Sequence, residues 1–266
     1  MTGSPTGLLL HLSGPLQSWG TGDVPANLRD SSRFPTRSGL IGLLACALGR
    51  SRDEKTDDLR ELRFTIRVDR PGSFLRDFQT IGGGMPRELT VITAEGKRRT
   101  PETATVVSER YYRQDAAFTV LVEGPSEVLS ACGEAVRYPR WPLYLGRRSC
   151  PPDAPLFLTL TDDPEPAQHL LKLPLARRPA GSAVHVEFIS DAPFVGELWP
   201  KDVAGGQGDA PFAEARTEPT SFVSNRRAYG LRRVYRLVAE VDGELCTKPG
   251  IPFLDRLTCY LSSDTP

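Results

Sequence analysis

The sequence predicts an α+β fold whose core has a split βαβ, ferredoxin-like arrangement, on two observations. The 266 residues are 39% apolar, which is enough apolar surface to bury a core. Their apolar patterns follow one another as strand, helix, strand, strand, helix, strand, the order of that arrangement. RNA-recognition motifs use the same order, but proteins of many functions share this arrangement, so the order alone does not indicate RNA binding.

The first strand and first helix are indicated by local patterns. Residues 8–12 form a short apolar run that the Ser-Gly-Pro of residues 13–15 is expected to close as a turn. Apolar residues at helical spacing then run over residues 40–48, with Thr36 or Ser38 as the N-cap. These segments predict a buried strand followed by a buried helix.

The next strands enclose an insertion. Residues 63–69 alternate apolar and polar side chains, which is typical of a half-buried strand. Apolar periodicity weakens over residues 78–112, where three consecutive glycines and a basic cluster predict an extended hairpin or ordered loop. The core resumes with a strand at residues 116–123.

The remaining elements complete the core and add a C-terminal part. Residues 127–136 have helical spacing and 155–160 read as a strand; later strands are expected at 183–189 and 233–240. The expected organisation is an RRM-like core of residues 1–77 and 114–180, an insertion of residues 78–113, and a small, mainly β subdomain of residues 181–266.

Composition excludes several classes of protein. No apolar stretch reaches eighteen residues, so no membrane span or membrane partner is expected. Five scattered cysteines without a CxxC pair and three histidines without metal-ligand spacing predict a cytoplasmic protein with no disulfides, metal or cofactor. The motifs of nucleotide, serine and metalloprotease hydrolases (GxxxxGK[ST], GxSxG, HExxH) and GxGxxG are all absent.

Arginine dominates the basic residues. The 33 basic residues balance 33 acidic ones, but only five are lysines, which leaves 28 arginines. A GC-rich genome favours arginine codons and is as good an explanation of this bias as a functional one. It does not explain why the arginines gather in Gly-, Pro- and Tyr-bearing connections, where planar guanidinium groups could reach the phosphates of a polyanion. Surface arginines paired with acids would give the same pattern.

Three stretches carry a specific resemblance. They are LSGPLQSWG at residues 12–20, RFPTRSGLIGLL at 33–44 and YLGRRSCP at 144–151, with LRDFQT at 75–80 and YYR at 111–113 between them. Their order and spacing resemble the CasD family, the CRISPR-associated family-five (RAMP superfamily) subunits of the type I-E Cascade complex. The likeness is strong over roughly residues 8–160, thins afterwards, and is absent from the tail after Cys246.

The resemblance implies an RRM-like (RAMP) core, a protruding β-hairpin thumb and a small C-terminal β part. It implies a subunit that caps the 5′ handle of the CRISPR RNA and contacts the CasC backbone and the large CasA subunit. Other Cascade subunits and target DNA would be partners within the complex. CasE cuts the RNA in this subtype, so the resemblance implies a role in antiviral defence without catalysis.

Single-stranded RNA is held by cations, by aromatic stacking and by hydrogen bonds to base edges. The residues expected to supply these contacts are Gln17, Trp19, Arg33, Thr36, Arg37, Ser38, Arg76, Tyr111, Tyr112, Arg113, Gly146, Arg147, Arg148 and Ser149. The expected thumb tip comprises Gly82, Gly83, Gly84, Met85 and Arg87. Bland alternatives stay open: Trp19 could be a core residue, Thr36 or Ser38 a helix cap, and the two tyrosines anchors of the thumb.

A second function is an endoribonuclease. In the sister subtype I-C, the family-five protein itself cuts the repeat RNA without a metal. Such chemistry needs a general base or acid, and the candidates here are His11, His169 and His185. None lies beside a tyrosine or lysine cluster in sequence, and His11 is expected to be a packed strand residue.

Overall fold

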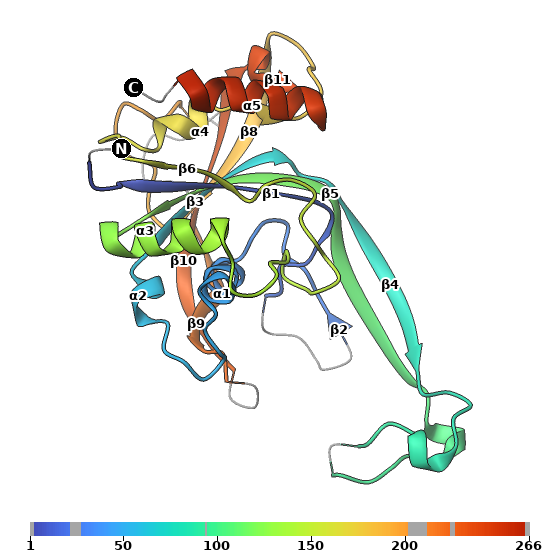
Figure 1. Ribbon diagram of the computed structural model, residues 1–266. Coiled ribbons are helices and arrows are strands. Elements are labelled where there is room, and N and C mark those ends of the chain that lie inside the picture. The colour runs from blue at the N-terminus through green and yellow to red at the C-terminus, as the bar shows by residue number, and fades with distance from the viewer. Residues whose placement is uncertain (1–2, 22–27, 94, 202–211, 224–226, 264–266) are drawn as a thin grey trace.

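The computed structural model describes residues 3–21, 28–93, 95–201, 212–223 and 227–263 (Figure 1). Its centre is a nine-stranded sheet whose main path runs β6-β1-β5-β3-β8-β10-β9, with antiparallel neighbours throughout. These strands are β1 (Gly7–Gln17), β3 (Arg63–Arg70), β5 (Val106–Glu123), β6 (Phe157–Thr161), β8 (Ala183–Ser190), β9 (Phe212–Ser221) and β10 (Ala228–Asp242). β2 (Leu28–Arg29) and β4 (Ser73–Ile81) pair with β5 off this path.

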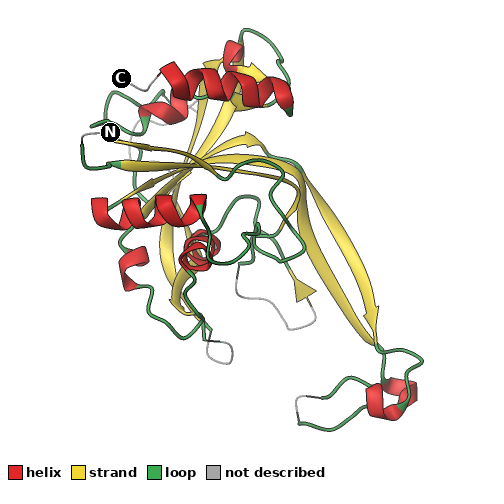
Figure 2. Ribbon diagram, viewed as in Figure 1, coloured by secondary structure: helices red, strands yellow, loops and turns green. Residues whose placement is uncertain are grey.

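Helices cover both faces of the sheet (Figures 1 and 2). They are α1 (Arg37–Leu48), α2 (Asp57–Arg60), α3 (Ser126–Arg137), α4 (Gln168–Lys172) and α5 (Ile251–Ser263), with short 3-10 turns at Arg87–Leu89, Pro101–Thr103 and Gly243–Leu245. α1 and α3 bury one core against the sheet, and α4 and α5 bury a second core on the opposite face. A small parallel pair, β7 (Leu175–Ala176) and β11 (Cys246–Thr247), lies beside the second core. The prediction of a mixed α+β fold is confirmed.

α1 forms as its caps predict. The Thr36 hydroxyl accepts a hydrogen bond from the Gly39 N–H at 3.3 Å, which settles the N-cap in favour of Thr36 over Ser38. Gly49 ends the helix in the left-handed conformation with φ 76°, and its N–H donates to the Cys46 carbonyl at 3.1 Å. The helix is therefore bounded by its own sequence.

β1 is longer than predicted. The turn expected at residues 13–15 does not form, because the strand continues to Gln17 and Gly14 pairs with Ala116 of β5. β6 pairs with β1 only as far as Leu10, so the second half of β1 has no neighbouring strand on that side. A proline is tolerated there because no neighbouring strand needs its missing N–H.

β3 is fully buried between Phe64 and Asp69, so the prediction of a half-buried strand is wrong. Its polar side chains face the second core. Arg67 is 1% exposed and donates to the Asp69 carboxylate at 2.7 Å and to the carbonyls of Leu170, Leu173 and Pro174 at 2.7–2.8 Å. The two charges neutralise each other, which allows polar residues in a buried strand.

β4 and the outer part of β5 form a long hairpin that projects from the body (Figure 1). The pairing begins at Ser73 opposite Gln114, so the hairpin starts before the residue 78 expected from sequence. Residues 82–105 connect its two strands. Several of its apolar side chains are exposed, including Phe74, Phe78, Met85 and Leu89.

The chain after residue 180 continues the main sheet. β8 pairs with β3, and β10 pairs with β8, so these strands extend the sheet that begins with β6. Strands were expected here at 183–189 and 233–240, and both are present. β9 and the helix α5 were not expected. Among the described residues, no helix is long and apolar enough to cross a membrane.

Candidate nucleic-acid interface

Four segments meet where β1 ends: the loop of residues 144–150, the start of α1, β2 and the root of the hairpin. The Ser18 N–H donates to the Leu145 carbonyl at 3.0 Å, and the Ser18 hydroxyl donates to the Tyr111 carbonyl at 3.4 Å. β2 pairs with β5 through Leu28 and Glu109. Residues far apart in sequence are thus held together at one corner of the molecule.

Gly146 allows the loop to lie directly on the end of β1. Its φ is +87°, a conformation that side chains other than glycine rarely adopt. An alanine Cβ at this position would lie 1.6 Å from the Ser18 carbonyl oxygen, which is an impossible contact. The loop is closed by the Leu145 N–H, which donates to the Cys150 carbonyl at 2.8 Å.

Arg147 links this loop to the hairpin root and to β2. Its guanidinium carbon lies 4.6 Å from the ring centroid of Tyr112, and it donates to the Arg29 carbonyl at 3.0 Å. Its Nη1 atom is buried and has no hydrogen-bond partner among the described residues. Tyr112 is only 5% exposed, and its ring packs beneath the Arg147 guanidinium.

Arg113 and Arg33 add further positive charge. Arg113 is buried and donates to the carbonyls of Pro71 and Gly72, with its guanidinium over the Phe74 ring at 4.3 Å. Burial lowers the pKa of the Arg113 guanidinium, and the neighbouring charge of Arg33 lowers it further. Arg33 itself is exposed.

We call Arg29, Arg33, Arg113, Arg147 and Arg148 the arginine cluster. None of the five forms an ion pair with a carboxylate in the part of the chain that the structure describes. Other arginines of the body are paired: Arg37, Arg50, Arg60, Arg67, Arg70, Arg232 and Arg236 all have carboxylate partners. The cluster is therefore a concentration of cations without carboxylate partners, which suits a polyanion. Arg29, Arg33 and Arg148 are exposed, whereas Arg113 is buried and, contrary to the prediction of an RNA contact, adds its charge from within the protein.

The prediction that Gln17 and Trp19 contact RNA is wrong, because both are core residues. Both are 0% exposed. The Trp19 indole N–H donates to the Gln17 side-chain oxygen at 2.9 Å, and the Gln17 amide donates to the Ala116 carbonyl at 2.9 Å. Their hydrogen bonds are satisfied inside the protein, so the pair supports the corner from beneath.

The start of α1 also differs from expectation. Arg37 is 7% exposed, and its guanidinium is 2.5 Å from both the Asp191 and Glu218 carboxylates. Thr36 and Ser38 are buried as well, so only Arg33 of this predicted set reaches the surface. The correction arises because β9, which carries Glu218 and was not predicted, closes over the start of α1.

The exposed members of the predicted set lie in the loop and on the hairpin. Arg148 and Ser149 are exposed beside Gly146, whereas Tyr111 is half-buried. Arg76 is 56% exposed and forms an ion pair with Glu109 at 2.6 Å across the hairpin. The structure thus brings part of the predicted set to one corner and places Arg76 along β4.

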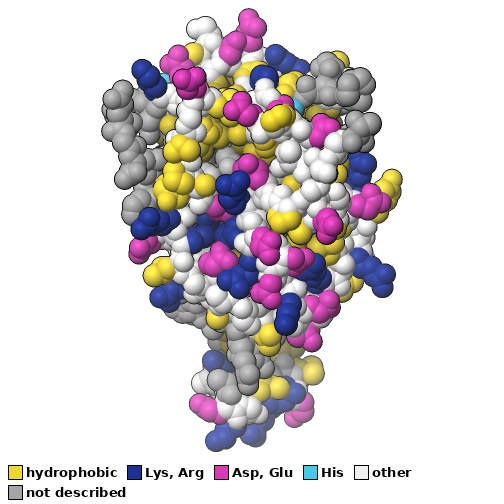
Figure 3. Space-filling model, turned by 90° about the vertical axis from the view of Figure 1, so that its left-hand side faces the viewer, with side chains coloured by type: hydrophobic (Ala, Val, Ile, Leu, Met, Phe, Trp, Pro, Cys, Tyr) yellow, Lys and Arg dark blue, Asp and Glu magenta, His cyan; other side chains and the backbone are white. Residues whose placement is uncertain are grey.

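The expected thumb tip lies in the connection between β4 and β5. Gly82 and Gly84 take positive φ values of 82° and 72°. Gly83 lies between them, Met85 is 48% exposed and Arg87 is exposed in a 3-10 turn. Figure 3 shows basic side chains together with a few acidic ones at this end of the molecule.

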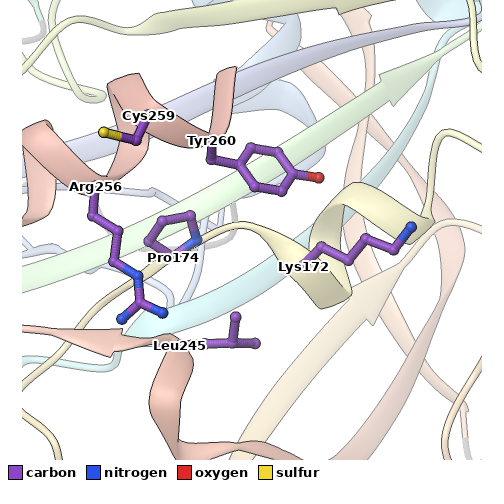
Figure 4. A pocket seen from close by; sticks show the side chains of 6 residues that line it. All are labelled: Lys172, Pro174, Leu245, Arg256, Cys259 and Tyr260. Atoms are coloured by element: carbon purple, nitrogen blue, oxygen red, sulfur yellow. The ribbon is translucent and has the colours of Figure 1, made fainter. Parts of the chain in front are cut away.

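Two hollows are lined by residues outside the arginine cluster. One of about 280 Å³ lies beside the start of α1 and is lined in part by Thr21, Phe34 and Arg232. Another of about 380 Å³ lies on the opposite face, lined by Lys172, Pro174, Leu245, Arg256, Cys259 and Tyr260 (Figure 4). The cations of the second hollow already donate to Gln168 and to the Glu244 carbonyl.

The histidines do not lie in the arginine cluster. His11 is 2% exposed and packs on Phe253 of α5, with ring centroids 4.9 Å apart. His169 is buried with hydrogen bonds to Thr161 and Tyr260. His185 is exposed on β8, three strands from β1, with Glu240 3.8 Å away. His11 and His169 thus belong to the second core.

His11 predicts a pH dependence of stability. Burial lowers the pKa of the His11 imidazole below its ordinary value of 6.5, although Asp69 opposes this. As pH falls below 6.5, the unfolded chain takes up a proton before the folded chain does, so stability is lost. We expect a fall in Tm from pH 7 to pH 5 that is steeper in the natural protein than in His11→Met. Parallel curves for the two proteins would contradict this role.

Comparison with known proteins identifies the family. The model of the family described as CRISPR-associated protein (Cas_Cas5) matches residues 7–235, a span that includes the arginine cluster and the hairpin. This chain belongs to that family of CRISPR-associated proteins.

Two kinds of relative make the likeness more specific. The chain is 38% identical over 188 residues to the CRISPR system Cascade subunit CasD of Escherichia coli (strain K12), covering 68% of this chain and 80% of CasD. A chain of a solved CRISPR RNA-guided surveillance complex superimposes with a TM-score of 0.80 at 38% identity, covering 97% of this chain and 100% of that one. A solved Cas protein superimposes with a TM-score of 0.61 at 30% identity, covering 92% of this chain and 99% of that one.

Proposed function

We propose that the protein is a non-catalytic subunit of a type I-E Cascade that binds and caps the 5′ handle of the CRISPR RNA in antiviral defence. The observation that carries the proposal is the arginine cluster, whose unpaired guanidinium groups lie around the loop of residues 144–150. Guanidinium groups bind phosphate in a bidentate manner, and Arg148 and Ser149 beside Gly146 are exposed. The likeness to CasD supports the choice of complex.

We further propose that the core is RRM-like and that the hairpin is a thumb. The strand order β6-β1-β5-β3, with α1 and α3 on one face, supports an RRM-like core. The hairpin extends from the edge of the arginine cluster because Tyr112 and Arg113 lie at its root. A strand of RNA held at the cluster would therefore meet the thumb as it leaves.

The proposed protein partners are the CasC backbone and the large CasA subunit. Phe74 and Phe78 of the hairpin are 51% and 58% exposed, and Leu89 near its tip is 66% exposed. Exposed apolar side chains on a projecting element are typical of a surface that a partner covers. This supports the hairpin as the part that packs on CasC.

The endoribonuclease alternative is not favoured. Two of its three candidate histidines, His11 and His169, are buried in the second core, on the face of the sheet covered by α5. A general base must come within hydrogen-bond reach of the 2′-hydroxyl of the RNA. The buried positions of these histidines support a binding role without cleavage.

The test is incubation of the purified protein with labelled CRISPR repeat RNA in EDTA, beside the same reaction supplemented with CasC and CasE. We expect the protein alone to leave the RNA intact, and to be retained on handle-bearing RNA in the assembled complex. Cleavage by the protein alone, abolished by a His-to-Ala change, would instead establish the endoribonuclease.

A further inference from the structure

A second basic and aromatic stretch precedes the loop of residues 144–150 in sequence. It is the stretch Tyr-Pro-Arg-Trp-Pro of residues 138–142, which we call the aromatic segment. Tyr138 is 76% exposed and Trp141 is 41% exposed. No acidic residue occurs between residues 135 and 152, whereas four arginines do. Exposed aromatic rings among unneutralised arginines are typical of single-stranded nucleic-acid binding.

The aromatic segment is held in place by the end of α1. The Arg140 N–H donates to the Ala47 carbonyl at 2.9 Å. The Cys46 thiol donates to the Pro142 carbonyl at 3.7 Å. The Arg140 stem packs over Gly49, where an added Cβ would lie 2.4 Å from Arg140 Cγ. The backbone of the segment is therefore anchored at two points.

Two prolines stiffen the segment further, because each fixes its own φ. Tyr138 begins the segment directly at the end of α3, with its N–H donating to the Glu134 carbonyl at 2.9 Å. A ring presented from a fixed backbone loses little conformational entropy when a base stacks on it. The two exposed rings are thus prepared for contact.

The segment is also continuous with the arginine cluster. Only Leu143 separates it from the loop of residues 144–150. Burial raises the pKa of the Cys46 thiol, and the positive charge of Arg148 opposes this rise. The same thiol donates a hydrogen bond to the Pro142 carbonyl. Arg148 therefore reaches towards the end of the aromatic segment at Pro142, and Trp141 is the residue before that proline.

We infer that Tyr138 and Trp141 form a base-stacking subsite that extends the path of single-stranded RNA beyond the arginine cluster. The inference rests on the proposed function, since it needs RNA held at Arg148. The ligand is RNA because the segment carries no acidic residue and adjoins unpaired guanidinium groups. The stacked bases are read by their faces and not by their edges, so the subsite tolerates any base.

Tryptophan fluorescence gives a direct test. The chain has three tryptophans. Trp19 is 0% exposed, and Trp199 is packed by Phe188 and Phe194 with ring centroids 5.5 and 4.8 Å away. A stacked base quenches the indole that it covers. We expect an unlabelled RNA that carries the repeat-derived 5′ handle to quench the tryptophan fluorescence of the natural protein and of Trp199→Phe. The same RNA should not quench the fluorescence of Trp141→Phe.

Affinity gives the second readout. We expect Tyr138→Ala/Trp141→Ala to weaken binding of the same RNA roughly tenfold or more, without changing the salt dependence, because no charge is lost. Tyr138→Phe/Trp141→Phe should retain the affinity. Ile251→Ala, which removes another exposed apolar side chain at the start of α5, is the control. Circular dichroism and Tm establish that each variant is folded.

The outcomes separate this inference from the proposed function. If Arg33→Ala/Arg148→Ala weakens RNA binding while the aromatic variants and the quenching do not change, the subsite is wrong and the capping function stands. If the aromatic variants bind RNA normally but no longer assemble with CasC, the segment contacts protein, which also overturns the subsite. If no variant changes RNA binding, the proposed function fails as well.

Discussion

Replacement of Arg67 by alanine is expected to lower the free energy of unfolding by about 3–5 kcal/mol, the usual cost of leaving a buried charge without its partner. Asp69 is 0% exposed and its carboxylate is 2.7 Å from the Arg67 guanidinium. The variant would also leave the Leu170, Leu173 and Pro174 carbonyls without their donor. The second core would lose the link between β3 and the segment before β7.

Urea denaturation measures this effect, and two variants sharpen it. Arg236 is 55% exposed and paired with Glu187, so Arg236→Ala should cost less than about 1 kcal/mol. Arg67→Ala/Asp69→Ala should recover part of the loss, because no uncompensated charge remains. Equal stability of Arg67→Ala and Arg236→Ala would show that the buried pair does not hold the second core together.

Gly146→Ala is expected to reduce affinity for handle RNA at least tenfold, or about 1.4 kcal/mol. The added Cβ cannot lie 1.6 Å from the Ser18 carbonyl, so the loop of residues 144–150 must move away from β1. The left-handed backbone adds roughly 1–2 kcal/mol of strain. Arg147 and Arg148 would move with the loop.

Gly250→Ala is the matched control for this change. Gly250 also has a positive φ, +94°, but an added Cβ meets no atom within 4 Å, and the position lies before α5. It therefore imposes the same kind of backbone strain without the collision. If Gly146→Ala and Gly250→Ala bind handle RNA equally well in a filter-binding assay, the loop is not part of the interface.

Elements with local signals could be predicted from the sequence. α1 is defined by its cap and stop residues, and the buried face of α3 follows from helical spacing. β1 was underestimated because Gly14 and Pro15 form a turn in most contexts, whereas here β5 pairs past them. The alternation in β3 predicts a half-buried strand, because the neutralising contact between Arg67 and Asp69 depends on a second layer that no local pattern reveals.

The site shows the same division. The Gly-Arg-Arg-Ser loop is predicted from its resemblance to the CasD family, and the structure leaves its Arg148 and Ser149 exposed. The local pattern does not reveal that Arg37 is paired, because its partners, Asp191 and Glu218, lie more than 150 residues away in sequence. Arg29 was absent from the predicted set, although its spacing of four from Arg33 was a usable signal. Pairing with distant acids decides which arginines stay available.

The salt dependence of RNA binding tests the central claim most directly. Each phosphate contact on single-stranded RNA contributes roughly 0.7 to the slope of log affinity against log salt. The charges of Arg33 and Arg148 are exposed and unneutralised by described carboxylates, so Arg33→Ala/Arg148→Ala should lower the slope by about 1.4 and weaken handle binding at all salt concentrations. The matched variant Arg63→Ala/Arg236→Ala loses two exposed, paired arginines and should bind as the natural protein does. Identical slopes for all three proteins would contradict the account.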